Sequence, residues 1–389
     1  MVARSNQLTV TAPTKGACLM VANYSPDVGY AWWLMEHYWV LIAEFLASRG
    51  RRALLAYPAR GAIPPHILAA PIDVVWLDYG SRSAAGWQAL SRTVAREGIT
   101  SLYLTDRAFS DLRYARLRGL GVQSIVVHDH TPGDRPPIRG MRGWLKARMH
   151  RFGPWSANYY VAVSEFVRRR MIDNARVPVE RTVVVPNGVT AFQYVETDRA
   201  WAREQLGARD GDLVVGMVAR ANRIKGIEVG IQSARVVLAQ EPRALFVFVG
   251  DGPDLDLFRR LAAEAGVGER FRFLGRRGDA RRLMAGFDVG LHPSMSEVGY
   301  CLAILEMMNA GLPVIVPDRP SVSGATEPGV TGLWYPPDDV SACGSTILDL
   351  LQDSVRRQGL GRAAYLQSLT RYSLARADEA FLSSVANCL

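Results

Sequence analysis

The stretch at residues 288–318 constrains the fold more than any other part of this 389-residue chain. A short apolar run stops at His292, a polar turn follows, and a helical pattern begins after Gly299. The helix ends at Gly311, and a second short apolar run comes next. Because buried strands and amphipathic helices alternate in this way only in α/β proteins, the stretch predicts one repeat of a parallel α/β sheet.

Two glutamates in this stretch are candidates for sugar binding. Glu297 is predicted on the loop at the carboxyl end of the strand, where open α/β sheets bind ligands, and Glu306 about two turns into the helix. A carboxylate can accept hydrogen bonds from both hydroxyls of the vicinal diol in a ribose or a hexose. Alternatively, Glu297 is solvated and Glu306 only lines the helix. Four backbone N–H groups near the helix start could bind a phosphate: those of Gly299, Tyr300, Cys301 and Leu302.

The alternation of strands and helices continues through the whole chain. Candidate strands of the first half are residues 18–21, 53–57, 74–77, 101–105, 124–128, 161–163 and 183–187. Candidate strands of the second half are residues 213–218, 244–249, 271–274, 289–291 and 314–316. The pattern predicts two α/β domains with parallel sheets, at residues 1–190 and 191–373, followed by a last helix within residues 374–389.

Composition excludes several classes of protein. No apolar run reaches about 18 residues and the N-terminus has no signal-peptide core, so neither a membrane span nor secretion is expected. The four cysteines are scattered without a C-x-x-C, which indicates reduced thiols in a cytoplasmic protein. The net charge of +9 suits anionic lipid or phosphorylated small molecules, whereas no nucleic-acid-binding signature is present.

The sequence of residues 288–318 resembles the C-terminal signature of the retaining GT-B glycosyltransferases of family 4, roughly S-E-G-F-G-L-x-x-L-E-A-M-A-x-G-x-P-V-I. The family usually has about seven residues between its two glutamates, whereas Glu297 and Glu306 have eight between them. Glu306 therefore carries over directly, and Glu297 carries over only if its loop contains a one-residue bulge. The other matching positions are Gly299, Tyr300, Leu302, Leu305, Met307, Gly311, Pro313, Val314 and Ile315, while Cys301 replaces a glycine.

The resemblance implies the GT-B architecture, in which two Rossmann-like domains face each other across a cleft and the C-terminal helix packs back on the first domain. It implies retaining transfer of a sugar from a nucleotide-sugar donor, bound by the second domain, to a glycan, a lipid-linked saccharide or a small molecule, bound by the first. No metal or other cofactor is expected. The alternatives are a GT-B-fold nucleotide-sugar epimerase or hydrolase, and a non-catalytic subunit that binds sugar nucleotides.

A second motif, at residues 216–226, resembles the family's G-R-x(4)-K-G element. In that role Arg220 and Lys225 would stabilise the negative charge that builds on the departing diphosphate. A pair of solvated loop cations is the alternative, and Arg223 is a nearby competitor. Two fixed cations remove the need for a metal, so the D-x-D at residues 254–256 is assigned to the first turn of a helix, where acidic residues favour the helix dipole.

Two short motifs extend the resemblance on the donor side. V-G-D-G-P, at residues 249–253, supplies Gly250 for close approach to the donor. F-L-G, at residues 273–275, resembles the element whose following backbone meets the nucleobase, which points to Gly275 and Arg276. A plain turn between strand and helix is the alternative for the first motif.

The first half contributes a histidine and a glycine to the resemblance. I-V-V-H-D ends the fifth candidate strand and places His128 toward the donor sugar and the acceptor, with His130 as the reserve. Retaining enzymes of this family have no settled nucleophile, so His128 is expected to orient substrate and not to act as a general base. A structural histidine is the alternative. Gly29 is the one glycine in the first loop that could approach the diphosphate closely.

Residues 139–152, RGMRGWLKARMHRF, predict a basic amphipathic helix. Cations near an anionic bilayer surface add about 1 kcal/mol each to binding, so this helix predicts peripheral contact with the cytoplasmic face of a membrane. A solvated helix face on a protein that never meets a membrane is the alternative.

Overall fold

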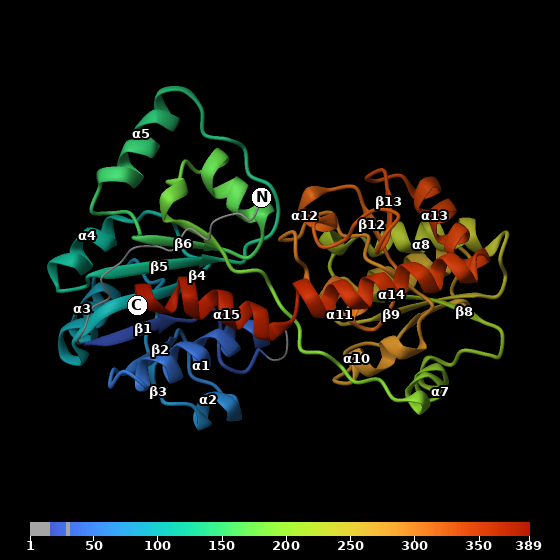
Figure 1. The fold of residues 1–389 in the computed structure, drawn as a ribbon, viewed down its shortest axis with the longest axis horizontal. Helices are drawn as coiled ribbons and strands as arrows, with labels where there is room; N and C mark the ends of the chain where they lie inside the picture. The colour runs from blue at the N-terminus through green and yellow to red at the C-terminus, as the bar shows by residue number, and fades with distance from the viewer. Residues whose placement is uncertain (1–15, 29–31) are drawn as a thin grey trace. The chain divides into compact units, whose positions relative to one another are not determined.

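The structure is a computed structural model, and it describes residues 16–28 and 32–389 (Figure 1). Its contacts divide the chain into two compact units. Unit 1 comprises Met1–Thr131, Arg135–Pro186 and Ala377–Leu389, and unit 2 comprises Pro132–Asp134 and Asn187–Arg376. The chain thus returns to unit 1 for its last residues, and each unit is described by itself below.

Unit 1 is built on a parallel seven-stranded sheet in the order β3-β2-β1-β4-β5-β6-β7. The strand order reverses between β1 and β4, and such a reversal is where open α/β sheets bind ligands beyond the carboxyl ends of their strands. The strands are β1 (Ala17–Val21), β2 (Ala53–Tyr57), β3 (Ile72–Trp76), β4 (Ile99–Thr105), β5 (Ser124–Asp129), β6 (Tyr159–Ala162) and β7 (Thr182–Val184).

In unit 1, a helix from the N-terminal part of the chain, α1 (Trp33–Ala47), packs against one from the C-terminal part, α15 (Leu374–Ser384). Tyr38 and Trp39 of α1 are fully buried, as expected for the core face of an amphipathic helix. Phe381 of α15 stacks on Tyr38 with ring centroids 4.7 Å apart, and His37 pairs with Asp378 at 2.7 Å. The helices are α1 (Trp33–Ala47), α2 (Pro65–Ala69), α3 (Ala84–Glu97), α4 (Leu112–Gly119), α5 (Gly140–Phe152), α6 (Glu165–Arg169) and, from its fourth residue on, α15 (Leu374–Ser384).

Unit 2 has a parallel six-stranded sheet in the order β10-β9-β8-β11-β12-β13, which reverses between β8 and β11. Its strands are β8 (Leu213–Val218), β9 (Ala244–Val249), β10 (Phe271–Phe273), β11 (Val289–Leu291), β12 (Val314–Pro317) and β13 (Gly332–Tyr335). Its helices are α7 (Glu196–Leu206), α8 (Ile227–Leu238), α9 (Leu255–Glu264), α10 (Ala280–Leu283), α11 (Leu302–Asn309), α12 (Pro320–Ser323), α13 (Val340–Gln352) and α14 (Ser354–Arg371). The predicted fold class, two parallel α/β sheets, is confirmed.

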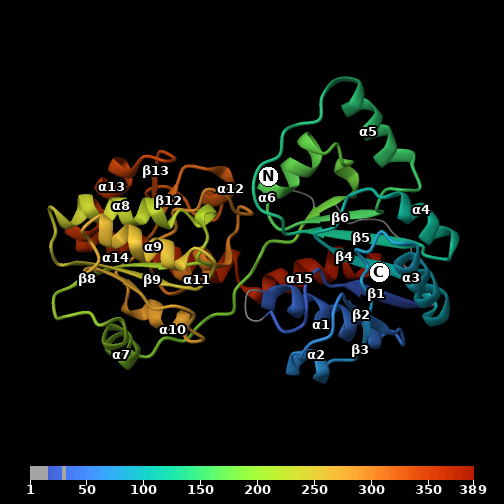
Figure 2. The ribbon, with the colours of Figure 1, turned by 180° about the vertical axis from the view of Figure 1, so that it is seen from behind.

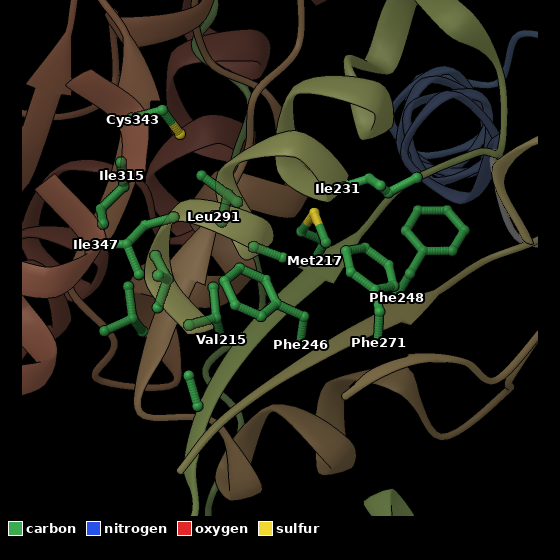
Figure 3. Close-up of a cluster of buried hydrophobic side chains, with 14 of the residues drawn as sticks. Val215, Met217, Ile231, Phe246, Phe248, Phe271, Leu291, Ile315, Cys343 and Ile347 are labelled. Atoms are coloured by element: carbon green, nitrogen blue, oxygen red, sulfur yellow. The ribbon is translucent and has the colours of Figure 1, made fainter. Parts of the chain in front are cut away.

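Alternating side chains of the central strands bury both faces of the unit 2 sheet. Val215 and Met217 of β8 pack with residues of α8, α9 and α13 on one face (Figure 3), whereas Val214 packs with residues of α7 and α11 on the other. Figures 1 and 2 show α8 and α13 on one side of this sheet and α7 and α10 on the other. Because both faces are covered, ligand-binding groups can stand only on the loops at the strand ends.

Candidate functional site

Two loops meet at the point where the unit 2 strand order reverses. The loop after β8 carries Gly226, which has φ 66°, and a Cβ added there would lie 1.9 Å from the carbonyl oxygen of Pro293. The N–H of Met295, on the loop after β11, donates to the carbonyl of Ile224 at 2.8 Å. A residue other than glycine at 226 would force the loops apart, so this position fixes how the two loops pack.

Four side chains from these loops and the following turn form what we call the lysine–glutamate cluster. The Lys225 Nζ lies 2.5 Å from Glu297 Oε1, and the His292 Nε2 lies 2.9 Å from the same oxygen. The Cys301 Sγ lies 3.6 Å from His292 Nε2. The Glu297 side chain is 7% exposed, whereas that of Lys225 is 22% exposed and so remains open to a ligand.

The cluster keeps its carboxylate ionised although it is buried. Burial alone would raise the pKa of Glu297, but the Lys225 ammonium and the His292 ring outweigh it and lower that pKa to about 2. For His292, burial opposes the charged form, but Cys301 and Glu297 raise its pKa to about 9. Burial likewise opposes the charge of Lys225, and Glu297 and Cys301 more than compensate, so the pKa of Lys225 is raised. Lys225 is therefore a fixed cation.

The structure separates the three cations of the loop after β8. Arg220 is exposed and, within residues 16–28 and 32–389, has no ion pair. Arg223 pairs with Glu228 at 3.0 Å, so the competitor named by the sequence already has a partner. Arg223 and its partner lie outside the lysine–glutamate cluster, whereas Lys225 is oriented by the buried Glu297. Lys225 and Arg220 stay the two loop cations predicted to meet a diphosphate.

The start of α11 differs in part from the prediction. The N–H of Gly299 donates to the carbonyl of Ser321 at 2.6 Å, so this group is not available to a phosphate. The carbonyl of Tyr300 accepts from Asn187 at 2.9 Å. Cys301 is the N-cap residue and its side chain makes no capping bond, which leaves the first N–H groups of Leu302 and its successors for an anion. Glu306 is buried in the second turn of α11.

The donor-side glycines lie at the ends of β9 and β10. The N–H of Gly250 donates to the carbonyl of Gly275 at 2.9 Å, which joins the two loops. Gly250 has φ 154°, and a Cβ there would lie 1.8 Å from the carbonyl oxygen of Ala219 at the end of β8. Arg276 follows and is exposed. The loops of β8, β9 and β10 therefore share one edge with the lysine–glutamate cluster, and the donor-binding roles of these residues stay predictions.

In unit 1, His128 is the last residue but one of β5 and is fully buried. Its Nδ1 lies 2.5 Å from the hydroxyl oxygen of Tyr103, and its ring lies 4.1 Å from that of His130. The Nε2 atoms of both histidines are buried and, among the described residues, have no hydrogen-bond partner. Burial, helped by His130, lowers the pKa of His128, so its ring is neutral. Gly29 lies outside the described residues.

The fold brings two further residues to these sites that the sequence motifs did not indicate. His292 marked only the end of a predicted strand, although it lies five positions before Glu297. Asp106 directly follows β4, with φ 53°, and its carboxylate accepts the N–H of His130 at 2.6 Å. Burial raises the pKa of Asp106 to about 7, and the neighbouring Asp129 adds to the rise. A polar residue directly after a predicted strand was the signal available for Asp106.

Within the described residues, one group of side chains could hold a metal ion. The ligand atoms of His292, Glu297 and Cys301 lie within 4.8 Å of one another, and these are zinc-ligand types. The Lys225 ammonium competes for the same carboxylate oxygen and repels a cation. The D-x-D residues lie at the start of α9 and both have protein partners: Asp254 accepts the N–H of Arg223 on the loop after β8 at 3.0 Å, and Asp256 pairs with Arg259 at 2.9 Å.

Comparison with protein families matches both units. The model for glycosyl transferases group 1 matches residues 198–367, and the model for Glycosyltransferase Family 4 matches residues 35–191. Together the two matched ranges cover most of the chain. The chain belongs to glycosyltransferase family 4. The motifs at residues 288–318 and 216–226 thus resemble those of the family to which this chain belongs.

Two curated glycosyltransferases are similar in sequence to this family 4 chain. The D-inositol 3-phosphate glycosyltransferase of Nocardia farcinica is 31% identical over 246 residues, which cover 60% of this chain and 53% of the relative. A Corynebacterium glutamicum enzyme is 28% identical over 190 residues, which cover 46% of this chain and 49% of that enzyme. It is a GDP-mannose-dependent monoacylated alpha-(1-6)-phosphatidylinositol monomannoside mannosyltransferase. The chain spans about half the length of the curated relatives it matches.

A solved structure supports the fold. The Anabaena protein HepE, crystallised with UDP and glucose, superposes with a TM-score of 0.74 at 21% identity. The superposition covers 95% of this chain and 98% of HepE. A likeness at this identity shows that the two proteins share the GT-B fold.

The cluster makes stability depend on pH. Folding raises the pKa of His292 from 6.5 to about 9, so its contribution is fully present below pH 6.5 and is lost as pH rises through 9. We expect the free energy of unfolding to fall in this window by on the order of a few kcal/mol. Thermal denaturation at a series of pH values measures the loss, and His292→Gln should flatten it. An equally steep loss in the variant would contradict the assignment.

Proposed function

We propose that this family 4 chain is a retaining glycosyltransferase that uses a nucleotide-sugar donor. The observation that carries the proposal is Lys225, held as a cation by the buried Glu297 at the reversal point of the unit 2 sheet. A nucleotide sugar leaves as a nucleoside diphosphate, and a fixed cation stabilises that charge more in the transition state than in the ground state. Arg220 adds a second cation that can grip a phosphate with two bonds.

The relatives support a donor and an acceptor of this kind. One relative is named as dependent on GDP-mannose and acts on a phosphatidylinositol mannoside, another is named for D-inositol 3-phosphate, and HepE was crystallised with UDP and glucose. We infer that Glu306 and Glu297 act on the donor side. His128 would orient substrate through its neighbours, because its Nδ1 is engaged with Tyr103 and its Nε2 is buried.

A panel of UDP-, GDP-, ADP- and dTDP-sugars tests the proposal. The bound donor should raise the melting temperature, because a ligand of the folded state stabilises it by RT ln(1 + [L]/Kd). With an acceptor, the protein should then form a glycoside of unchanged anomeric configuration. Free monosaccharide as the only product would favour a hydrolase, and donor binding without turnover would favour a non-catalytic subunit.

Sugar transfer should proceed without a divalent metal. Lys225 and Arg220 supply the positive charge that a metal gives in enzymes with a functional D-x-D, and Lys225 competes with a cation at Glu297. Activity should therefore survive excess EDTA, and Asp254→Asn with Asp256→Asn should retain most of it. Activity that is abolished by the chelator and restored by Mn²⁺ would contradict the charge assignment.

We also propose that α5 binds an anionic membrane surface, which would give the enzyme lipid-linked acceptors on the cytoplasmic side. Its apolar side chains face solvent instead of the core: Met141 is 80% exposed, Leu145 61% and Phe152 71%. Arg148 lies over the rings of Trp144 and Phe152, so cations and apolar groups share one face. Within the described residues no helix has the length and hydrophobicity that crossing a bilayer requires, and α5 would lie on the surface.

Vesicle sedimentation tests the role of α5. Wild-type protein should bind phosphatidylglycerol vesicles, and binding should weaken as salt is raised. Trp144→Asp combined with Leu145→Asp should lower the affinity roughly tenfold or more, because it removes apolar burial and adds repulsion. Leu68→Asp, at an equally exposed leucine of α2, is the matched control. Equal binding by both variants would rule out α5 as the contact.

A further inference from the structure

Unit 1 contains a pocket of about 180 Å³ at the carboxyl end of its sheet. The loop after β3, the loop after β4 and the first turn of α4 form its walls, so it lies wholly within one unit. We call it the arginine pocket: its aromatic lining residues are Tyr79 and Tyr114, and its charged ones are Arg82, Asp106, Arg107, Asp111 and Arg113.

Among the described residues Arg107 makes no ion pair, and the carboxylate of Asp78, which is not part of the lining, acts on it only at longer range. The Arg107 Nε is buried and, across residues 16–28 and 32–389, no hydrogen bond or ion pair satisfies its guanidinium. The guanidinium lies 5.4 Å from the ring centroid of Tyr79, whose hydroxyl is also buried without a partner. Leaving buried donors unpaired costs free energy, so two such groups in one pocket point to a ligand that pairs with them.

The other two arginines are held in place around a single carboxylate. Arg113 donates to the carbonyl of Tyr79 at 2.6 Å and lies 3.3 Å from Asp111. Arg82, from the opposite loop, lies 3.3 Å from the same carboxylate. One carboxylate therefore orients two guanidinium groups and neutralises the charge of only one, and the lining keeps an excess of positive charge.

Size and charge select the ligand. A pocket of about 180 Å³ is smaller than the roughly 300–1,000 Å³ of sites that enclose a whole small molecule, so it fits one group of a larger molecule. Three guanidinium groups face the carboxylate of Asp111 and the carboxyl of Asp106, whose pKa burial raises to about 7. The lining carries an excess of between one and two positive charges, and Asp78, near Arg107 but outside the lining, reduces it. A phosphate monoester suits the pocket better than a carboxylate, because its three acceptor oxygens can bind several guanidinium groups at once.

We propose that the arginine pocket binds a phosphate monoester carried by the acceptor. This inference rests on the function proposed above. Asp106 joins the pocket to the predicted substrate histidines: it accepts the N–H of His130 at 2.6 Å, and its own N–H donates to the carbonyl of His128 at 2.9 Å. A phosphate anchored by Arg107 would place the rest of the acceptor beside Asp106, the residue that contacts the backbone of both histidines.

Calorimetric titration of the full chain with inorganic phosphate and with glycerol 3-phosphate tests the pocket. Arg107→Gln should weaken both by about tenfold to a hundredfold, the usual cost of losing a charge-assisted hydrogen bond. Arg82→Gln, at the exposed side chain of the lining, should weaken them less and keeps the test valid if the first variant unfolds. Arg92→Gln, on the exposed face of α3, is the matched control and should bind like wild type.

Vesicles that contain phosphatidic acid distinguish a lipid source of the phosphate from a free one. Binding that depends on Arg107 only with vesicles would assign the pocket to a lipid headgroup, and dependence with glycerol 3-phosphate would assign it to a small molecule. Equal binding by wild type, Arg107→Gln and Arg82→Gln to every probe, or no binding at all, would overturn the proposal. Nucleotide-sugar binding, measured in the same samples, should not change, so failure of the donor chemistry and failure of this pocket are separate results.

Discussion

Lys225→Ala should slow sugar transfer by about a hundredfold or more, because removal of one transition-state charge contact costs about 3 kcal/mol. Arg220→Ala should also slow transfer, since its exposed guanidinium is the second cation predicted to meet the diphosphate. Initial rates with saturating donor and acceptor measure both effects. The melting temperature of Arg220→Ala should stay near that of wild type, because its side chain is exposed.

Arg223→Ala is the matched control for this pair of variants. Arg223 stands on the same loop and carries the same charge, but it pairs with Glu228 at the surface. Its removal should leave transfer almost unchanged. Near-normal turnover of both Lys225→Ala and Arg220→Ala would remove these residues from the site, and a large loss in Arg223→Ala would show that the loop's total charge matters and not its geometry.

Glu297→Gln should lower the free energy of unfolding by about 3–5 kcal/mol, the usual cost of breaking a buried ion pair from one side. The loss arises because Lys225 and His292 both rely on the same carboxylate oxygen. Denaturant unfolding monitored by fluorescence measures it. Donor binding should weaken as well, since the amide no longer holds Lys225 as a fixed cation.

Glu306→Gln separates ligand binding from stability. Glu306 is buried on α11, and we expect its carboxylate to accept hydrogen bonds from hydroxyl groups of the sugar donor. The amide of Glu306→Gln should weaken donor binding, because charge-assisted hydrogen bonds are lost. If donor binding depends on Glu297 and not on Glu306, the alignment of residues 288–318 with the family signature is wrong.

Much of the fold was predictable because the buried strands are short, apolar and separated by periodic helices. The predicted strands at residues 213–218 and 244–249 match β8 and β9 residue for residue. β13 (Gly332–Tyr335) was not predicted, since a four-residue edge strand with glycine and tryptophan gives little hydrophobic pattern. The predicted basic helix appears as α5 (Gly140–Phe152), one residue shorter than expected.

The site was less predictable, because its contacts join residues far apart in the chain. Lys225 and Glu297 stand 72 positions apart, and only the order of β8 and β11 in the sheet makes them neighbours. The eight-residue spacing left the direction of Glu297 open, and the structure shows it buried against Lys225. The arginine pocket could not be predicted either, because its lining comes from two loops and the start of α4, which are separated in the sequence and share no motif.

Lys225 is proposed to bind the diphosphate of a nucleotide-sugar donor in unit 2. Calorimetric titration of wild type and Lys225→Ala with UDP, GDP, ADP and dTDP measures this contact. We expect one of these diphosphates to bind wild type and its affinity to fall about tenfold or more in the variant, the cost of a lost charge-assisted contact. Equal affinity in the two proteins, or no binding of any of the four to wild type, would contradict this proposal.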